Sequence, residues 1–198
     1  MHFLRISALS TSNNGRTSWE IANKVFVSYH HANDQYYRDR FERLFDYHYD
    51  IMVSESVQMG DIDPNLQTET VRQKIRDEYL RNPTVTVVLI GAKTWQRKHV
   101  DWEIGMSIRD TEKNPRAGLL GIFLPTHPDY GRDRYNPHII PPRLYDNVQC
   151  EFAKLYHWTE SPNRIQSWIH EAFKRRYEIT PNNSYPSFKN NRSGTGWQ

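Results

Sequence analysis

The sequence predicts an α/β fold in which helices cover both faces of a central, mostly parallel sheet. Short runs of apolar, mainly β-branched residues alternate with longer segments whose apolar residues recur every three or four positions. The run Thr84–Gly91 (TVTVVLIG) is apolar almost without interruption, as expected for a central strand that is covered on both faces. Together these two observations favour a three-layer fold with a five-stranded sheet.

Five segments are predicted to be strands of this sheet. Each is short, rich in β-branched or aromatic residues, and bounded by polar residues, Gly or Pro. They are Lys24–Tyr29, Ile51–Val53, Thr84–Gly91, Gly118–Leu124 and Phe152–Trp158.

Four amphipathic segments are predicted to be helices that pack on the sheet, and the second must end before Pro83. The expected N-caps are Asn33 or Asp34 for the first helix, Thr94 for the third, and Ser161, followed by Pro162, for the last. The expected inward faces are Tyr37, Phe41, Leu44 and Phe45; Val71, Ile75 and Tyr79; Val100, Ile104 and Ile108; and Ile165, Trp168, Ile169, Ala172 and Phe173.

This alternation of strands and helices is flavodoxin-like in outline. Parallel sheets of this kind bind ligands at the carboxyl ends of their strands. We therefore expect the functional site in the loops that begin at Tyr29, Ser54 and Gly91.

One domain, residues 23–180, accounts for the whole pattern. Residues 1–22 are predicted to be an N-terminal extension, and residues 181–198 a polar C-terminal tail that frays. Residues 125–150 carry five prolines and are predicted to form a long inserted loop.

The composition favours a folded cytoplasmic protein that binds neither nucleic acid nor membranes. The net charge is only +3, and the basic run 174–176 falls in the last turn of a predicted helix, where cations complement the helix dipole. The longest apolar stretch, Val85–Ala92, is too short to cross a bilayer. The single cysteine, Cys150, excludes an internal disulfide and fits a reducing compartment.

Polar and aromatic side chains gather at two of the predicted strand ends. Ser28, Tyr29 and His30 follow the first strand. Glu103 lies on the helix after the third strand, with His99 one turn before it. Since positions 99 and 103 share a helical ridge beside the apolar face, we expect the carboxylate to point toward the strand ends.

Several of these segments resemble the TIR superfamily, and most closely the TIR-like proteins of Thoeris anti-phage systems (the ThsB type). The similar segments are VFVSYH, TVTVVLIG, Thr94-Trp95 and the run from His99 to Ile104. The similarity covers about residues 24–125. TIR enzymes place a Trp four residues before the catalytic Glu, whereas this chain has His99 in that position.

The resemblance implies an enzyme that cleaves NAD⁺ at the nicotinamide–ribose bond. Bond cleavage develops positive charge at the ribose, and a fixed carboxylate stabilises that charge. The implied catalytic residue is Glu103, with NAD⁺ as substrate and no resident cofactor or metal. Side chains expected to bind the substrate are Ser28, Tyr29, His30, Ser56, Trp95 and His99.

The resemblance also implies partners. An ADP-ribose-derived nucleotide would be made as a signal and recognised by a separate effector. Self-association and a phage-derived trigger are expected to control its production.

Two alternatives remain open from the residues. The chain could be a non-catalytic, self-associating TIR-like signalling module. More weakly, His99 and Glu103 could bind a metal with His30 or His31. A phospho-receiver is disfavoured because Gly91 stands where a receiver needs an aspartate.

Overall fold

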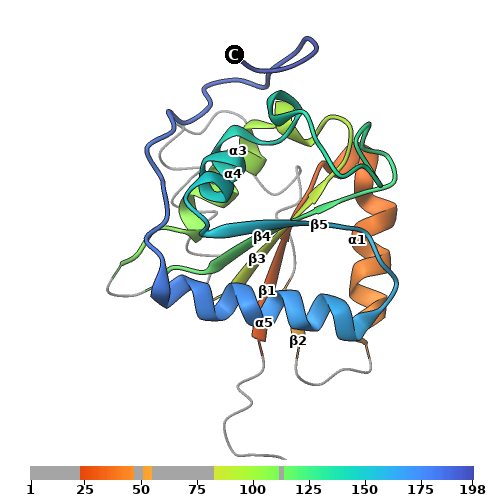
Figure 1. Cartoon of the computed structure of the whole chain (residues 1–198), viewed down its shortest axis with the longest axis vertical. Helices are drawn as coiled ribbons and strands as arrows, with labels where there is room; N and C mark the ends of the chain where they lie inside the picture. Colours follow the sequence, from red (N-terminus) through yellow and green to blue (C-terminus); the bar gives the residue numbers. More distant parts are fainter. Residues whose placement is uncertain (1–22, 47–50, 55–82, 112–113) are drawn as a thin grey trace, which may run out of the picture.

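The computed structural model describes residues 23–46, 51–54, 83–111 and 114–198. Their centre is a five-stranded sheet in which every strand is parallel to its neighbours, in the order β2-β1-β3-β4-β5 (Figure 1). The predicted flavodoxin-like class is confirmed. The strands are β1 (Asn23–Ser28), β2 (Ile51–Ser54), β3 (Val85–Ile90), β4 (Gly118–Phe123) and β5 (Ala153–His157).

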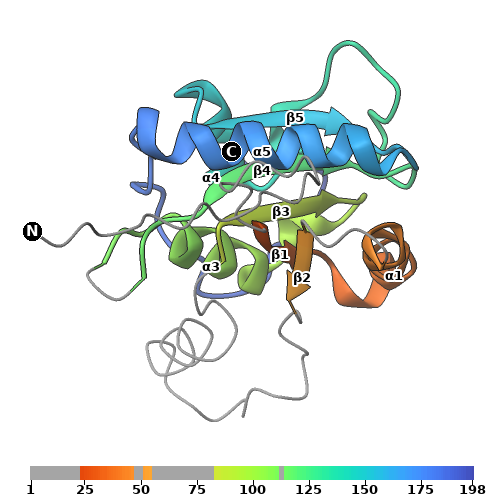
Figure 2. The same ribbon diagram turned by 90° about the horizontal axis from the view of Figure 1, so that it is seen from below.

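Helices cover both faces of the sheet. Helices α1 (His31–Phe45) and α5 (Pro162–Glu178) pack on one face, and α3 (Lys98–Ser107) and α4 (Pro142–Gln149) pack on the other. Figure 2 shows α5 and α3 on opposite sides of the central strands. All six residues of β3 are fully buried, as expected for a strand covered on both faces.

The predicted inward helix faces are confirmed wherever the structure describes them. Buried side chains form the centre of each face, and partly buried aromatic or aliphatic side chains lie beside them. The predicted second helix, with Val71, Ile75 and Tyr79, lies outside the described residues. The buried members are Phe41, Phe45, Val100, Ile104, Ile108, Ile165, Ile169 and Ala172, and the partly buried ones are Tyr37, Leu44, Trp168 and Phe173.

Two predicted helix caps are wrong. Helix α1 begins at His31 with His30 at its N-cap, so Asn33 and Asp34 lie inside its first turn. Thr94 opens a short 3₁₀ turn, η2 (Thr94–Gln96), and α3 begins only at Lys98. The Thr94 hydroxyl accepts a hydrogen bond from the Gly91 N–H at 2.9 Å, which closes the turn after β3 instead of capping a helix.

The proline-rich segment 125–150 is not one long loop. It contains the 3₁₀ turn η3 (Pro137–Ile139) and all of α4. Pro142 occupies the first turn of α4, where proline has no hydrogen bond to lose and its fixed φ favours a helix. The eight-residue helix buries Leu144 against the sheet.

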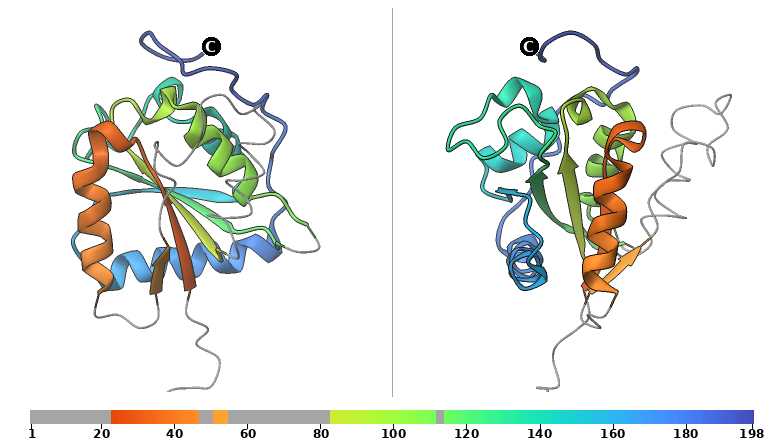
Figure 3. Two further views of the ribbon diagram at one scale, coloured as in Figure 1. Left: turned by 180° about the vertical axis from the view of Figure 1, so that it is seen from behind. Right: turned by 90° about the vertical axis from the view of Figure 1, so that its right-hand side faces the viewer.

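The C-terminal residues 181–198 do not fray as the sequence predicted. They run from the end of α5 past α3 (Figure 3, left) and bury Phe188. Their polar side chains and backbone groups bond to the helices, so their polarity does not indicate exposure. Among the described helices, none is both long and apolar enough to span a membrane.

Candidate functional site

Glu103 lies where α3 meets the carboxyl end of β1. Its neighbours Val100 and Ile104 point into the core, and Glu103 itself has no exposed surface. Ser28, the last residue of β1, donates a hydrogen bond from Oγ to Glu103 Oε2 at 2.5 Å. A strand end and a helix 75 residues later in the chain are thus joined by the carboxyl group.

Burial controls the protonation of this carboxyl group. Loss of solvation raises the pKa of Glu103 to about 8, although the hydrogen bond from Ser28 lowers it. The other oxygen, Oε1, has no hydrogen-bond partner among the described residues. In this closed arrangement the group is therefore mostly protonated at neutral pH.

A group of rings lies next to the Glu103 carboxyl. The Tyr29 and His31 rings stack with centroids 4.3 Å apart, and the His31 ring meets the His99 ring edge-on at 5.4 Å. His99 lies one turn before Glu103 and hydrogen-bonds the backbone of Tyr29. The ring group therefore ties the first turn of α1 to the first turn of α3.

The imidazoles of His30 and His99 are neutral. Burial, helped by neighbouring cations and histidines, lowers the pKa of His30 to about 4 and that of His99 to about 3. Within the described part of the chain, His30 Nδ1 and His99 Nε2 have no hydrogen-bond partner. Neutral imidazole nitrogens of this kind can donate to, or accept from, a polar ligand without adding charge.

The structure brings together four of the six residues expected to bind substrate. Ser28 bonds to Glu103, Tyr29 and His99 lie beside it, and His30 lies close to His99. Trp95 is buried in η2 with 2% of its surface exposed, so its ring offers no open face for stacking. The sixth, Ser56, lies outside the described residues.

His31 also lies among these rings, although the sequence suggested it only as an alternative metal ligand and not as a substrate-binding residue. The first turn of α1 places its ring between Tyr29 and His99. The sequence predicts that this helix starts after Asn33 or Asp34, which leaves His31 in the preceding loop and away from His99.

The alternative of a metal site finds no support in the geometry. Nowhere in the described ranges do three or more His, Cys, Asp or Glu side chains gather in an arrangement that could hold a metal ion. The His31 and His99 rings contact each other, and the Glu103 carboxyl accepts its hydrogen bond from Ser28.

Asp34 forms a second buried carboxyl group at the same edge of the sheet. Its oxygens accept hydrogen bonds from Thr94 Oγ1 and Thr126 Oγ1, each at 3.3 Å, and burial raises its pKa to about 6. These bonds join the start of α1 to the segments that follow β3 and β4. A side chain expected to cap a helix therefore links the first turn of α1 to two other segments.

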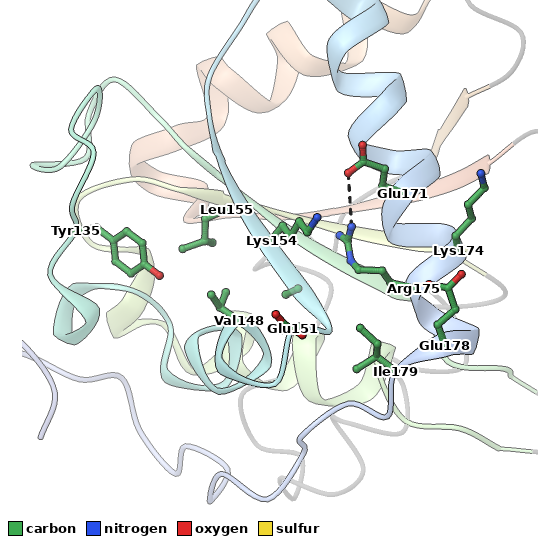
Figure 4. A pocket seen from close by; sticks show the side chains of 11 residues that line it. Tyr135, Val148, Glu151, Lys154, Leu155, Glu171, Lys174, Arg175, Glu178 and Ile179 are labelled. Atoms are coloured by element: carbon green, nitrogen blue, oxygen red, sulfur yellow. Dashed lines mark ion pairs between the residues drawn. The ribbon is translucent and has the colours of Figure 1, made fainter.

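A groove of about 730 Å³ lies elsewhere, between α4, β5 and α5 (Figure 4). Arg175 and Glu171 form an ion pair in it, and Tyr135 and Leu155 contribute to its walls. None of the candidate site residues lines this groove. The Glu103 site is enclosed and lies at the end of β1, an interior strand. The open groove lies beside β5, which is an edge strand of the sheet.

A comparison with models of known protein families shows to which family the chain belongs. The family model of the TIR-like domain of the Thoeris protein ThsB matches residues 26–129. The chain belongs to the ThsB TIR-like family. The matched part of this ThsB-type domain contains the second half of β1, all of β3 and β4, and Glu103. Helix α4, strand β5, helix α5 and the C-terminal residues follow it. A search of curated proteins found no match.

Proposed function

We propose that this ThsB-type protein cleaves NAD⁺ at the nicotinamide–ribose bond, an activity of the NAD⁺ nucleosidase or ADP-ribosyl cyclase type. The observation that carries the proposal is the Glu103 carboxyl group, buried beside Ser28 at the carboxyl edge of the sheet. Members of the TIR-like family can be NAD⁺-cleaving enzymes. Ligands of parallel α/β sheets bind at this edge.

The reaction needs one fixed negative charge. The bond between ribose C1′ and the nicotinamide nitrogen breaks, and its electron pair leaves with nicotinamide as a neutral molecule. The ribose is left as an oxocarbenium-like cation, which the ionised Glu103 stabilises. Water then adds to give ADP-ribose with loss of a proton, or a hydroxyl or ring nitrogen adds to give a cyclic or conjugated product.

The raised pKa of Glu103 fits this role once substrate is present. NAD⁺ carries its positive charge on the nicotinamide ring, and a nearby cation favours the ionised form of a carboxyl group. The enclosed site must first open to admit the nucleotide, since Glu103 has no exposed surface. We infer that self-association or a phage-derived trigger supplies this opening.

The product acts as a signal in this proposal. The chain makes an ADP-ribose-derived nucleotide in the bacterial cytoplasm, and a separate effector binds it during anti-phage defence. NAD⁺ is consumed as substrate, so no resident cofactor takes part.

The test is to incubate the concentrated protein with NAD⁺, with and without phage lysate, and to measure nicotinamide and nucleotide products by chromatography and mass spectrometry. Glu103→Gln keeps the shape and removes the charge, so its rate should fall by about 10²–10³. Glu178→Gln, an exposed position on α5, is the matched control and should match the wild type.

Two results would contradict the proposal. Near-normal nicotinamide release by a folded Glu103→Gln variant would remove the carboxylate from the mechanism. Failure of the wild type to release nicotinamide under any condition would favour the non-catalytic signalling module.

A further inference from the structure

The C-terminal residues lie along the helix that carries Glu103, in the opposite direction to it. The Asn183 side chain donates to the Gly105 carbonyl near the end of α3. At the start of α3, Asn191 Oδ1 accepts from the Lys98 N–H at 3.0 Å. The contacts therefore cover the helix from end to end (Figure 3, left).

The centre of this contact is a buried ion pair. Arg143 of α4 donates from Nε to Asp101 Oδ1 at 2.9 Å, and each side chain is 2% exposed. The backbone N–H of Phe188 donates to Asp101 Oδ2 at 2.9 Å. Trp102 Nε1 donates to the Phe188 carbonyl, also at 2.9 Å. Two adjacent α3 residues thus bond both backbone groups of Phe188, as a neighbouring strand would.

Arg143 also bonds the segment directly. Its guanidinium donates to the carbonyls of Asn183 at 3.2 Å and Tyr185 at 2.7 Å, and to Asn183 Oδ1 at 2.6 Å. Gly105 allows this approach, since a Cβ there would lie 3.2 Å from Arg143 Nε. The bonds are mostly to backbone atoms, which is how proteins bind extended peptides.

A second anchor lies beyond α3. The Trp197 N–H donates to the His138 carbonyl at 2.9 Å, and Trp197 Nε1 donates to the Ile140 carbonyl at 2.7 Å. Within residues 182–197, one apolar side chain is buried, that of Phe188.

The segment contacts a different stripe of α3 from the one that holds Glu103. Positions 98, 101, 102 and 105 share one face of a helix, whereas 99, 103 and 107 share another. The bonds from the C-terminal residues to α3 are therefore to residues other than Glu103. The C-terminal residues contact the face formed by positions 98, 101, 102 and 105, which we call the outer stripe of α3, and hold the helix against the core.

We propose that the outer stripe of α3 and Arg143 form a docking groove for an extended peptide, and that residues 182–197 of the chain occupy it. Docking positions α3 and with it Glu103. The effect on catalysis rests on the proposed function, whereas the docking itself does not. Because Phe188 is the one apolar side chain that the segment buries, the segment opens at a lower free energy than the sheet does.

Amide hydrogen exchange of the full-length protein tests the docking. Phe188→Ala should speed exchange both in residues 182–197 and in α3 by at least about tenfold, and leave β3 unchanged. Phe188→Leu keeps a buried apolar side chain and should stay near the wild type. Lys189→Ala, an exposed neighbour in the same segment, is the control.

A synthetic peptide of residues 182–198 provides the second arm. Added to Phe188→Ala, it should restore slow exchange in α3, whereas a peptide of scrambled sequence should not. An unchanged rate of exchange in α3 of Phe188→Ala would overturn the proposal. Faster exchange throughout β3 would also overturn it, because the segment would then be part of the core.

Nicotinamide release separates the two proposals. The kcat of Phe188→Ala should fall with little change in KM, and the peptide should restore it. Recovery of slow exchange without recovery of rate would overturn the positioning of Glu103. If the wild type releases no nicotinamide, the proposed function fails, and the exchange results still decide whether the segment docks.

Discussion

Burial of the Glu103 carboxyl group raises its pKa and also lowers the stability of the fold at neutral pH. Its pKa of about 8 lies well above the ordinary value of 4.5, because burial removes solvent from the charged form. Between these two pH values the folded protein holds a proton that the unfolded chain has lost. Folding therefore takes up a proton at neutral pH, and the stability contributed by the protonated group is lost progressively as the pH rises from about 4.5 to about 8.

Glu103→Gln should consequently stabilise the fold at neutral pH. The amide mimics the protonated carboxyl and does not titrate, so the variant should exceed the wild type by about 3 kcal/mol at pH 7. The difference should shrink toward pH 5. Urea unfolding at a series of pH values measures it, with Glu178→Gln as the exposed control. Parallel stability curves for wild type and variant would contradict the burial argument.

Individual site residues were partly predictable from the sequence. Ser28 follows from the rule that ligands bind at strand ends. The catalytic role of Glu103 is implied by the resemblance to TIR enzymes, and the ridge shared by positions 99 and 103 only predicts where its carboxylate points. The hydrogen bond between Ser28 and Glu103 did not follow, since it depends on how α3 packs. His31 was missed because its role depends on where α1 begins, and helix boundaries are poorly defined by sequence.

At the scale of elements, buried Asp34 locks the start of α1 to the turn after β3. A Cβ added at Gly91 would lie 2.3 Å from both Asp34 carboxyl oxygens. No side chain fits there unless the carboxyl group moves. Gly91 is therefore required by the close approach of Asp34 from a different element.

A double-mutant cycle tests this lock. Gly91→Ala alone should destabilise the protein by about 1–3 kcal/mol through overpacking. In an Asp34→Ala background the same change should be nearly neutral, because the opposing oxygens are gone. Urea unfolding of the four proteins gives the coupling free energy. Additive effects, within about 0.5 kcal/mol, would mean that the two positions do not clash.

The elements themselves were predicted better than their ends. The predicted strands agree with the structure to within one residue at each end, because apolar runs bounded by polar residues mark them clearly. Helix α4 was missed because it is short and its prolines suggested a loop. The cap errors share a feature that local sequence does not show: Asp34 accepts hydrogen bonds from Thr94 and Thr126, which lie far from it in the chain.

At the scale of the whole molecule, the order of the strands and the docking of the C-terminal residues were beyond the sequence. Both depend on contacts between segments far apart in the chain, such as Asp101 with Phe188. Asparagine side chains suggested a solvated tail, yet Asn183 accepts a hydrogen bond from Arg143 and Asn191 accepts one from the Lys98 N–H.

An enclosed Glu103 predicts that activity depends on assembly. If self-association opens the site, the rate of nicotinamide release per mole of protein should rise with protein concentration. A dilution series, paired with sedimentation to follow the oligomeric state, measures this. A monomer with a constant molar rate across the series would show that the chain opens its own site.

Strand β3 has a consequence for how the protein fails when it is heated. Its residues VTVVLI carry no charge, no proline and a strong β preference, and all are buried in the native state. Once unfolding exposes them, copies of this segment can pair with one another faster than the parallel sheet reforms. Heat inactivation should therefore be irreversible, with an apparent midpoint that shifts with the rate of heating.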